Sequence, residues 1–512
     1  MSWREIRPAA TSLPRSSAAD WNPVALIEGT FARRPPWGRN SHRYRGGAGL
    51  RPFRPGCNAG AGSRVDTSER TVSAGERDMA ERARVAIVGG GIGGLAAAAF
   101  AARAGARVTL FERLSEAGGR ARTRTERGFA FNMGPHALYS GGAAMAALRE
   151  LGIEVAGRRP PTSGGLAYCD GKLSALPGGA VSLLSTSLLG PREKLELGRL
   201  LTRLPALDKR ALVGTTLAAF LEAEVRSQRV RDVVLTVVRV TSYAHAPEAM
   251  DAAAALEQLA LGLDPGVLYL DGGWRPMVES LEAAARAAGA EIRKGVCVER
   301  VVHSGAVQAL ELDGNERVPA DAVVLALGPD EAAKLVDGDA QPCLAAVRAA
   351  CLPVRAACLD LGLAALPRPK QIFALGVERA LYFSVHSATA RELAPVGTHL
   401  LQLARYLAPD ESPSREEVET ELDAMLDVVQ PGWRAHVLTR KVMRDLVVTH
   451  DVPQAARGGI AGRAPVAVDG VRGLFLAGDW VGPTGMLADA SFASARAAGL
   501  AAAGAASVRA AA

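Results

Sequence analysis

Three glycines early in the chain constrain its fold more than any other feature. Between Val85 and Leu95 a short apolar strand leads into Gly89, Gly91 and Gly94, which have the spacing G-x-G-x-x-G. Gly89 permits a tight turn from strand to helix, Gly91 lets a pyrophosphate approach the backbone, and Gly94 lets the helix pack closely on the sheet. The pattern therefore predicts a β-α-β unit that binds a dinucleotide.

An acidic residue at the end of the next strand supports this prediction. We expect a helix to begin at about Ile92 and the following strand, residues 107–111, to end on Glu112. Glu112 lies 23 residues after Gly89, close to the spacing of roughly 20 that is typical of an acid that accepts a hydrogen bond from a ribose hydroxyl. The helix N-terminus offers unpaired N–H groups and a partial positive charge to the phosphates.

The segment before this unit differs in composition from the rest of the chain. Residues 1–78 hold 13 arginines, no lysine and seven acidic residues, and so carry most of the formal net charge of +7. They show no sustained helical or strand period, and Met79 lies shortly before the first strand. We interpret 1–78 as a disordered or non-native extension; a transit peptide is the alternative, because such leaders are rich in Arg and poor in acids. The remaining chain is nearly neutral, and we expect no nucleic-acid partner.

Composition and cysteine spacing bound the class of protein. With 48% apolar and 22% charged residues, the chain resembles soluble globular proteins, and its length predicts two or three domains. Six cysteines form no C-x-x-C pair and no zinc-spaced cluster, so we expect reduced thiols, no metal site and a cytoplasmic protein. The uncharged run 85–102 is long enough for a membrane span, but its glycines favour strand, turn and helix. We expect no transmembrane helix and no signal peptide.

Further elements are predicted along the body of the chain. Residues 141–270 have the spacing of helices, for example at 142–151, 192–204 and 213–224. A helix over 277–288 precedes a strand at 298–302 and a hairpin that turns at Asp313-Gly314. The apolar run 320–329 is typical of a strand inside a parallel sheet, and 473–479 predicts a last strand before a helix over about 489–505.

Four of these motifs, in this order, resemble the FAD-dependent amine oxidase and phytoene desaturase superfamily. They are the glycine motif with Glu112, the loop Gly118-Gly119-Arg120, the strand at Val298 before the apolar run, and 474–479. The resemblance covers about residues 80–505. It implies an α/β fold in which a Rossmann-like FAD-binding domain with a three-layer core (79–150, 271–335 and 456–512) is interleaved with an α/β substrate domain (151–270, mostly helical, and 336–455).

The resemblance also implies that the cofactor is FAD and assigns residues to it. The pyrophosphate would face the glycine motif and Arg120, the adenosine ribose would meet Glu112, and the adenine would meet the backbone of Val298. Residues 478–479 would approach the ribityl chain, residues 134–136 would lie near the flavin ring, and the helix after 486–488 would direct its N-terminal dipole at the pyrimidine edge. The predicted contacts are Gly89, Gly91, Ile92, Gly93, Gly94, Glu112, Gly118, Gly119, Arg120, Gly134, Pro135, His136, Val298, Gly478, Asp479, Met486, Leu487 and Ala488.

Departures from the family pattern narrow the expected activity. Covalent monoamine oxidases have a cysteine near the C-terminal motif, whereas the nearest cysteine here is Cys358, so FAD is expected to bind non-covalently. The strand at 354–359 offers Arg355 where amine oxidases have an active-site lysine. The stretch 268–274 and the leucine-rich patch 183–189 look more like phytoene desaturases.

The predicted function is that of an FAD-dependent oxidoreductase that removes hydride from a small apolar molecule, by C–C desaturation of an isoprenoid or carotenoid-like substrate. Flavin N5 accepts the hydride, so the protein need supply only orientation, electrostatics and a dry pocket, and no catalytic residue is assigned. The alternatives are the reverse reaction, amine or protoporphyrinogen oxidation, and a non-catalytic lipid-binding protein like the guanine-nucleotide dissociation inhibitors. The electron acceptor is left open among O2, a quinone and NAD(P).

Several residues have two interpretations. Tyr243 and His245 either pack between helices or line a substrate pocket, and His136 either contacts the flavin or is a structural loop residue. The patch 183–189 is either buried core or a surface that dips into the inner membrane. Trp274 is expected to fill the core beside a turn.

Overall fold

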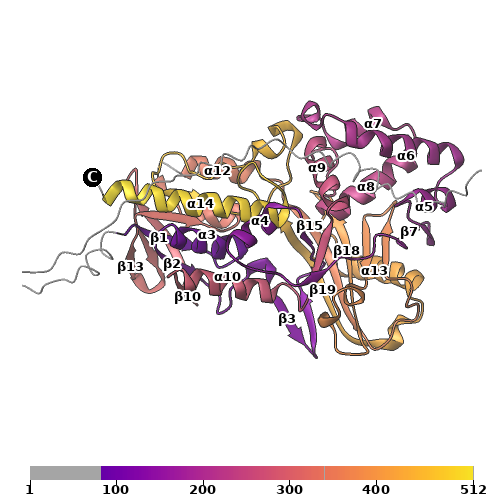
Figure 1. Cartoon of the computed structure of the whole chain (residues 1–512), viewed down its shortest axis with the longest axis horizontal. Coiled ribbons are helices and arrows are strands. Elements are labelled where there is room, and N and C mark those ends of the chain that lie inside the picture. The colour runs from indigo at the N-terminus through magenta and orange to yellow at the C-terminus, as the bar shows by residue number, and fades with distance from the viewer. Residues whose placement is uncertain (1–81, 339–340, 511–512) are drawn as a thin grey trace, which may run out of the picture.

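Two lobes lie side by side along the long axis of the molecule (Figure 1). The computed structural model describes residues 82–338 and 341–510, so the predictions for 1–78 lie outside the described residues. One lobe is built on a five-stranded sheet and the other on a seven-stranded sheet. Within the described ranges no helix is both long and apolar enough to span a membrane.

The first lobe contains the parallel sheet that the glycine motif predicts. Every neighbouring pair of its strands is parallel. In spatial order they are β10 (Glu291–Lys294), β2 (Arg107–Glu112), β1 (Arg84–Val88), β14 (Ala322–Leu325) and β20 (Leu474–Leu476). β14 and β20 are fully buried, as expected for apolar strands covered on both faces. The predictions of a β-α-β unit and of buried strands at 320–329 and 473–479 are thus confirmed.

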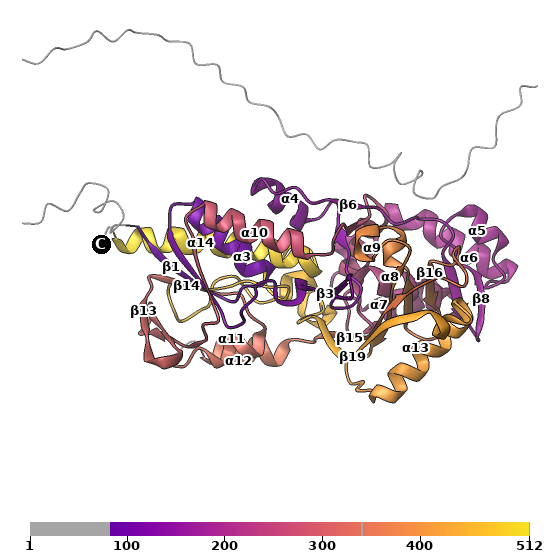
Figure 2. The ribbon, with the colours of Figure 1, turned by 90° about the horizontal axis from the view of Figure 1, so that it is seen from below.

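Helices cover one face of this sheet, and a small antiparallel sheet covers the other (Figure 2). The first face carries α3 (Ile92–Arg103), α4 (Ala143–Glu150), α10 (Arg275–Ala287) and α14 (Leu487–Ala510). The second carries β11 (Val298–His303), β12 (Val307–Leu312), β13 (Arg317–Pro319), α11 (Pro329–Lys334) and α12 (Gln341–Ala350). The α/β prediction of a three-layer core and the predicted hairpin at Asp313-Gly314 are therefore confirmed.

Small residues let helices α14 and α3 touch. A Cβ added to Gly499 of α14 would lie 2.6 Å from the carbonyl oxygen of Ala97 in α3. The alanine-rich face of α3, fully buried from Gly93 to Ala102, packs in the same contact. Because the backbones of α14 and α3 approach closely, the N-terminus of α14 at Leu487 is held near the glycine motif.

The second lobe contains a mostly antiparallel sheet with helices on both faces. Its strands, in spatial order, are β19 (Val437–Thr449), β15 (Val354–Leu363), β18 (His399–Leu407), β17 (Leu381–Ser384), β16 (Phe373–Gly376), β7 (Leu166–Cys169) and β8 (Lys172–Ala175). One face packs on α13 (Arg415–Val429). The other faces α8 (Gln228–Ser242), which belongs to a helical group with α5 (Ala180–Ser185), α6 (Pro191–Arg203), α7 (Leu217–Glu224) and α9 (Ala252–Leu263).

The prediction that 141–270 is largely helical is only partly right. Short strands also lie there: β6 (Gly157–Arg158), β7, β8 and β9 (Val267–Leu270). β7 pairs with β16, which is far away in the sequence, and β9 pairs with the short strand β5 (Leu138–Tyr139). Neither pairing has a local sequence pattern that could reveal it. The helix predicted over 213–224 begins at Leu217 instead, because Thr216 Oγ1 accepts a hydrogen bond from Ala219 N and caps it. A separate hairpin joins β3 (Thr123–Glu126) to β4 (Phe129–Asn132).

Candidate functional site

A cavity of about 740 Å³ extends from the glycine motif to the seven-stranded sheet. All the predicted cofactor contacts except Gly94, Gly134 and Met486 line it. The lining residues come from segments near 90, 118, 298, 478 and 487, which the fold brings together at one end of the parallel sheet. This is the end at which parallel sheets bind ligands.

The glycines have three different structural roles. Gly89 has φ +104°, and a Cβ there would lie 2.6 Å from Ala326 O, so the turn requires glycine. A Cβ on Gly91 would meet no protein atom within 4 Å, because this position opens onto the cavity. Gly94 does not line the cavity, and a Cβ there would lie 1.8 Å from Gly89 O, so it allows the helix to pack against the turn.

The N-terminus of α3 is left open for a ligand. Its N-cap is Gly91, which has no side chain that could accept hydrogen bonds from the N–H groups of the first turn. Ile92 and Gly93 of that turn line the cavity. Unpaired N–H groups and the helix dipole favour a phosphate at this position. The empty space beside Gly91 and the open helix end fit the pyrophosphate of a dinucleotide.

Glu112 is held by the backbone before any ligand arrives. Its Oε2 accepts a hydrogen bond from Gly90 N at 2.6 Å, and its Oε1 accepts one from Leu114 N at 2.8 Å. A carboxylate has about four acceptor positions, so two remain for ribose hydroxyls. Glu112 and Val298 both line the cavity, as the predicted adenosine contacts require.

Asp479 organises a small ionic cluster at the middle of the cavity. It is 3% exposed, and its Oδ2 lies 2.7 Å from Arg120 Nη1. Its Oδ1 lies 3.0 Å from His450 Nδ1, a residue that sequence reasoning missed. Burial alone would raise the pKa of Asp479, but Arg120 and His450 together hold it below its usual range. The carboxylate therefore stays ionised and positions Arg120, which also donates to Val448 O at 2.6 Å.

The loop predicted to lie near the flavin packs against the second lobe. Gly134 has φ +80°, and a Cβ there would lie 2.8 Å from Cys358 Sγ, so the loop needs glycine to lie on β15. Gly134 itself lies behind the wall that Pro135 and His136 form. The His136 ring meets the Trp274 ring edge-on at 5.0 Å, and burial lowers the pKa of His136. His136 is thus a neutral side chain in the cavity wall, and Trp274 is buried in the core as expected.

The start of α14 forms another part of the wall. Leu487 and Ala488 line the cavity, whereas Met486 is buried in the helical core of the second lobe. Asp489, which sequence reasoning also missed, accepts a hydrogen bond from Ala144 N at 2.8 Å and so ties α14 to the start of α4. Burial raises the pKa of Asp489 to about 6.

Small side chains form the cavity floor on the seven-stranded sheet. Ala356 and Cys358 of β15 and Ala404 of β18 line it, and Leu446 of β19 lies beside them. Tyr243 lines the cavity and also donates to Pro135 O at 3.0 Å, so both interpretations of this residue apply. The floor is apolar and leaves room above the sheet.

Two fully buried polar side chains continue this sheet face. Asp360 and Gln402 are paired across β15 and β18, and Gln402 Nε2 donates to Gly134 O at 2.7 Å. Asp360 Oδ2 has no hydrogen-bond partner, and burial raises the pKa of Asp360 to about 7. Arg355, the residue that replaces the expected lysine, donates instead to Asp445 and to carbonyls near Pro409, and it does not line the cavity.

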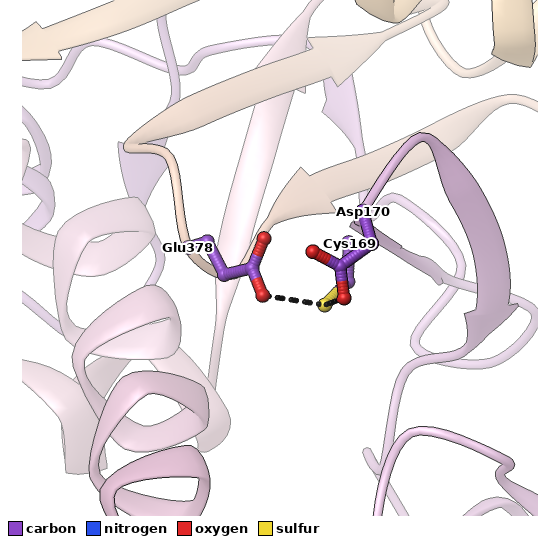
Figure 3. A group of neighbouring side chains, drawn as sticks. All are labelled: Cys169, Asp170 and Glu378. Atoms are coloured by element: carbon purple, nitrogen blue, oxygen red, sulfur yellow. Dashed lines mark hydrogen bonds between the residues drawn. The ribbon is translucent and has the colours of Figure 1, made fainter.

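A group of side chains outside the cavity has ligand atoms close enough to hold a metal ion. Figure 3 shows Cys169, Asp170 and Glu378 facing one another at the surface. Arg229 Nη1 lies 2.8 Å from Glu378 Oε1 and 2.7 Å from Cys169 Sγ, so a cation already balances the carboxylates. Burial and Glu378 raise the pKa of Cys169 to about 11, which keeps the thiol protonated. The geometry is that of a surface ion pair.

Comparison with known families identifies the class of protein. The statistical model of the flavin containing amine oxidoreductase family matches residues 92–504, most of the chain. The chain belongs to this family. A second model, for pyridine nucleotide-disulphide oxidoreductases, matches residues 46–128, which contain the glycine motif. Family membership confirms the predicted resemblance, the oxidoreductase class and the FAD cofactor. The empty space beside Gly91 and the uncapped start of α3, together called the glycine cradle, have room for its pyrophosphate.

Two curated relatives match about half of the chain. A 4,4'-diapolycopen-4-al dehydrogenase of Metabacillus indicus is 26% identical over 297 residues, 51% of this chain and 58% of that protein. A phytoene dehydrogenase of Streptomyces griseus is 30% identical over 277 residues, 47% of this chain and 53% of that protein. The chain thus matches little more than half the length of these relatives.

A solved structure confirms the architecture. An oxidoreductase of Methanosarcina mazei superposes with a TM-score of 0.65 at 20% identity, over 81% of this chain and 99% of that one. At this identity the similarity establishes the fold alone. It agrees with the predicted combination of a Rossmann-like cofactor domain and a second, substrate-binding domain.

Proposed function

We propose that this flavoprotein removes hydride from an apolar isoprenoid or carotenoid-like molecule and thereby desaturates a C–C bond. The observation that carries the proposal is the single cavity that joins the glycine cradle to the small-residue floor at Ala356, Cys358 and Ala404. An apolar substrate on that floor would lie next to the loop of Pro135 and His136. The names of the two carotenoid-type relatives support the same substrate class.

The chain's own residues supply binding and orientation in this proposal. Bound FAD supplies the hydride acceptor. Gly91 and the start of α3 hold the pyrophosphate, and Glu112 holds a ribose through the lone pairs that the backbone leaves free. His136 stays neutral, and the small side chains of the floor leave a dry space in which the substrate is positioned by its shape.

We also propose that FAD is bound without a covalent bond. Two cysteines line the cavity: Cys297, next to Val298 at the nucleotide end, and Cys358 on the sheet floor. Burial raises the pKa of the Cys358 thiol well above the usual value. The thiolate is the nucleophilic form of cysteine, so a thiol held protonated is a poor candidate for attachment. A flavin that remains in solution after the protein is denatured and removed by acid would agree with this proposal, and a flavin that precipitates with the protein would contradict it.

The partners in this proposal are a small apolar substrate, an electron acceptor (O2, a quinone or NAD(P)) and the surface of a membrane. Leu183 and Leu189 of the leucine-rich patch are buried, but Leu184 is 73% exposed and Val181 of the same helix is 70% exposed. Leu195 of α6 is also exposed. These helices lie at the end of the molecule farthest from the parallel sheet (Figure 1). An apolar tip of this kind suits an enzyme that collects its substrate from a bilayer.

The other enzyme alternatives find less support in the cavity. Amine oxidation would use a lysine at the strand where Arg355 stands, and Arg355 is engaged elsewhere. The dissociation-inhibitor alternative would need the same fold without a cofactor, whereas this chain belongs to a flavin-dependent family and keeps an open cradle at Gly91. The desaturase proposal therefore stands first.

Anaerobic bleaching of the flavin tests the proposal. The protein loaded with FAD is mixed with phytoene, putrescine or a porphyrinogen, and the oxidised-flavin absorbance near roughly 450 nm is followed. The expected result is that phytoene bleaches the flavin and that neither putrescine nor the porphyrinogen does. Bleaching by the amine or the porphyrinogen alone would overturn the substrate class, and a protein that takes up no FAD would overturn the cofactor.

A matched pair of variants ties the result to the cavity floor. Ala404→Phe places a ring on the floor and is expected to abolish bleaching while FAD absorbance is retained. Ala424→Phe, at an exposed position on α13, is the control and is expected to bleach like the wild type. Equal bleaching by both variants would show that the substrate lies elsewhere.

A further inference from the structure

His450 lies in the wall of the cofactor cavity, with one ring nitrogen bound and the other left for a ligand. It follows the last residue of β19, and 25% of its side chain is exposed. Its Nδ1 lies 3.0 Å from Oδ1 of the buried Asp479, and its backbone N–H donates to the same oxygen at 3.4 Å. An ionised carboxylate only accepts hydrogen bonds, so Nδ1 carries a hydrogen. In a neutral ring, Nε2 is then the nitrogen with the lone pair.

Nε2 of His450 lies close to the glycine cradle. A Cβ added to Gly328 would lie 2.6 Å from this nitrogen, and a Cβ added to Gly89 would lie 2.6 Å from Ala326 O. The short loop 326–328, which follows β14, therefore contacts the turn before the cradle with its first residue and the His450 ring with its last. Gly328 and His450 both line the cavity. A ligand in the cradle thus has the imidazole as a neighbour.

Arg120 approaches the cradle from the other side of the same carboxylate. Its Nη1 lies 2.7 Å from Asp479 Oδ2, and its loop is joined to the cradle by a β-bridge between Gly91 and Gly118. Arg122, two residues further on, also lines the cavity. Asp479 therefore holds an arginine on one oxygen and a histidine on the other. A carboxylate placed in this way fixes the orientation of an imidazole and stabilises its protonated form.

The other ionisable groups around His450 are engaged elsewhere. Those on α11, on α12 and in the segment after β19 form ion pairs, which are Asp330–Arg348, Glu331–Lys334 and Asp451–Arg457. Arg463 lies behind Asp479, donates to its backbone oxygen at 3.1 Å and does not line the cavity. Burial raises the pKa of the Cys351 thiol to about 12, so this thiol stays protonated. Histidine ordinarily gains or loses its proton between roughly pH 5 and 8, so His450 is the group at this part of the wall that a bound anion can protonate.

We propose that FAD binding adds a proton to His450, whose Nε2 then donates a hydrogen bond to the pyrophosphate. With Nδ1–H bound to Asp479, a neutral ring would turn a lone pair toward the phosphate oxygens, and two acceptors repel each other. A proton taken from the solvent converts Nε2 into a donor and makes the hydrogen bond charge-assisted. The negative charges of the pyrophosphate favour the protonated ring. His450 is thus a cofactor-binding residue, a role that requires FAD but no particular substrate and so goes beyond the proposed function.

Calorimetry in two buffers tests whether a proton is taken up. The apo-protein is titrated with FAD at about pH 7.5 in HEPES and in Tris, which release a proton with different enthalpies. Because the added proton comes from the buffer, the binding enthalpy of the wild type should differ between the two buffers. The difference should correspond to uptake of a fraction of a proton, up to about one. His450→Gln has no titratable ring, so its binding enthalpy should be the same in both buffers.

The same proton makes the affinity for FAD depend on pH. The FAD-bound protein holds a proton that the free protein lacks, so the dissociation constant of the wild type should rise with pH, by at most about tenfold per pH unit between roughly pH 7 and 9. The dissociation constant of His450→Gln should not change over this range. His450→Lys carries a permanent charge and should bind FAD without proton uptake, which separates the proton from the contact itself.

Controls assign the proton to His450. His436→Gln removes a histidine of the short helix η8 (Trp433–His436), outside the cavity, and should keep the proton uptake of the wild type. Asp489 also lines the cavity and has a pKa of about 6, so undiminished proton uptake in His450→Gln would assign the proton to another group and overturn the proposal. Equal binding enthalpies of the wild type in the two buffers would overturn it without any variant. None of these measurements uses a substrate, so failure here is distinct from failure of phytoene to bleach the flavin.

Discussion

The two ends of the cavity are built by different parts of the chain. At the nucleotide end, backbone groups make the site: the turn at Gly89, the open space at Gly91 and the free end of α3. At the sheet end, side chains make it, with small residues on the floor and the buried Asp360 beside them. A backbone site is encoded by closely spaced glycines, whereas a side-chain site depends on which strands pair.

The two ends also differ in how completely their buried charges are satisfied. Glu112 accepts two backbone hydrogen bonds, and Asp479 is bound by Arg120 and His450. By contrast Asp360, beside the sheet floor, keeps a carboxyl oxygen without a partner, and so does Asp489 at the start of α14. Glu112 and Asp479 are therefore preorganised for one ligand, whereas the carboxyl of Asp360 beside the sheet floor is incompletely satisfied.

The largest expected effects come from substitutions at two glycines of the motif, Gly91 and Gly94, and the two substitutions should act on different properties. Gly91→Val places its side chain in the cavity, where no protein atom lies within 4 Å of the new Cβ, so the fold should survive while FAD binding is lost by steric exclusion. Gly94→Ala places a Cβ 1.8 Å from Gly89 O and should destabilise the fold, by about 3 kcal/mol or more. Flavin absorbance after gel filtration and thermal melting of the apo-protein measure the two effects. Stoichiometric FAD in Gly91→Val would refute the assigned position of the pyrophosphate.

A smaller effect is expected from the ionic cluster between the two ends. Asp479→Ala releases Arg120 and His450 from the positions that the carboxylate gives them. We expect FAD to bind about ten- to a hundredfold more weakly, the range for loss of a charge-assisted hydrogen bond. Titration of the apo-protein with FAD measures it. Asp445→Ala, which removes the more exposed partner of Arg355, should leave the dissociation constant unchanged; a similar loss in both variants would contradict the role of Asp479.

The smallest effect is the contribution of Asp360, beside the sheet floor, to the pH dependence of the free energy of unfolding. Because burial raises the pKa of Asp360 to about 7, the native state holds a proton that the unfolded chain releases above about pH 4. The native state binds more protons in this window, so the carboxyl destabilises it increasingly as pH rises from about 4 to 7. Asp360→Asn removes this dependence, and its free energy of unfolding relative to the wild type should rise by on the order of 1–4 kcal/mol between pH 4.5 and pH 8.

Urea unfolding at the two pH values measures this change. Asp330→Asn, at the surface beside Arg348, is the control, and it should show no comparable trend. If the difference between Asp360→Asn and the wild type is the same at both pH values, Asp360 is ionised throughout and the description of the sheet end as poorly satisfied is wrong.

The limits of prediction follow the same division. The β-α-β unit and the strands at 322–325 and 474–476 could be predicted because each has a local apolar pattern or a fixed spacing of glycines. β7 could not, because it depends on β16, which is far away in the sequence. His450, Asp489 and Asp360 were missed for a related reason: a polar residue in or next to a strand or helix has no local signal that tells whether it will lie beside a cavity.

The end of the chain has a consequence for biosynthesis. β20 is the outer strand of the parallel sheet, and α14 packs on α3 and is tied to α4 by Asp489. Asp479 and Leu487 enter the cavity wall from this same late segment. During translation the glycine cradle emerges early, but the cofactor site stays incomplete until residues 474–510 have left the ribosome. Flavin capture therefore depends on this late segment, and chains cut short before β20 lack part of the wall that would hold the cofactor.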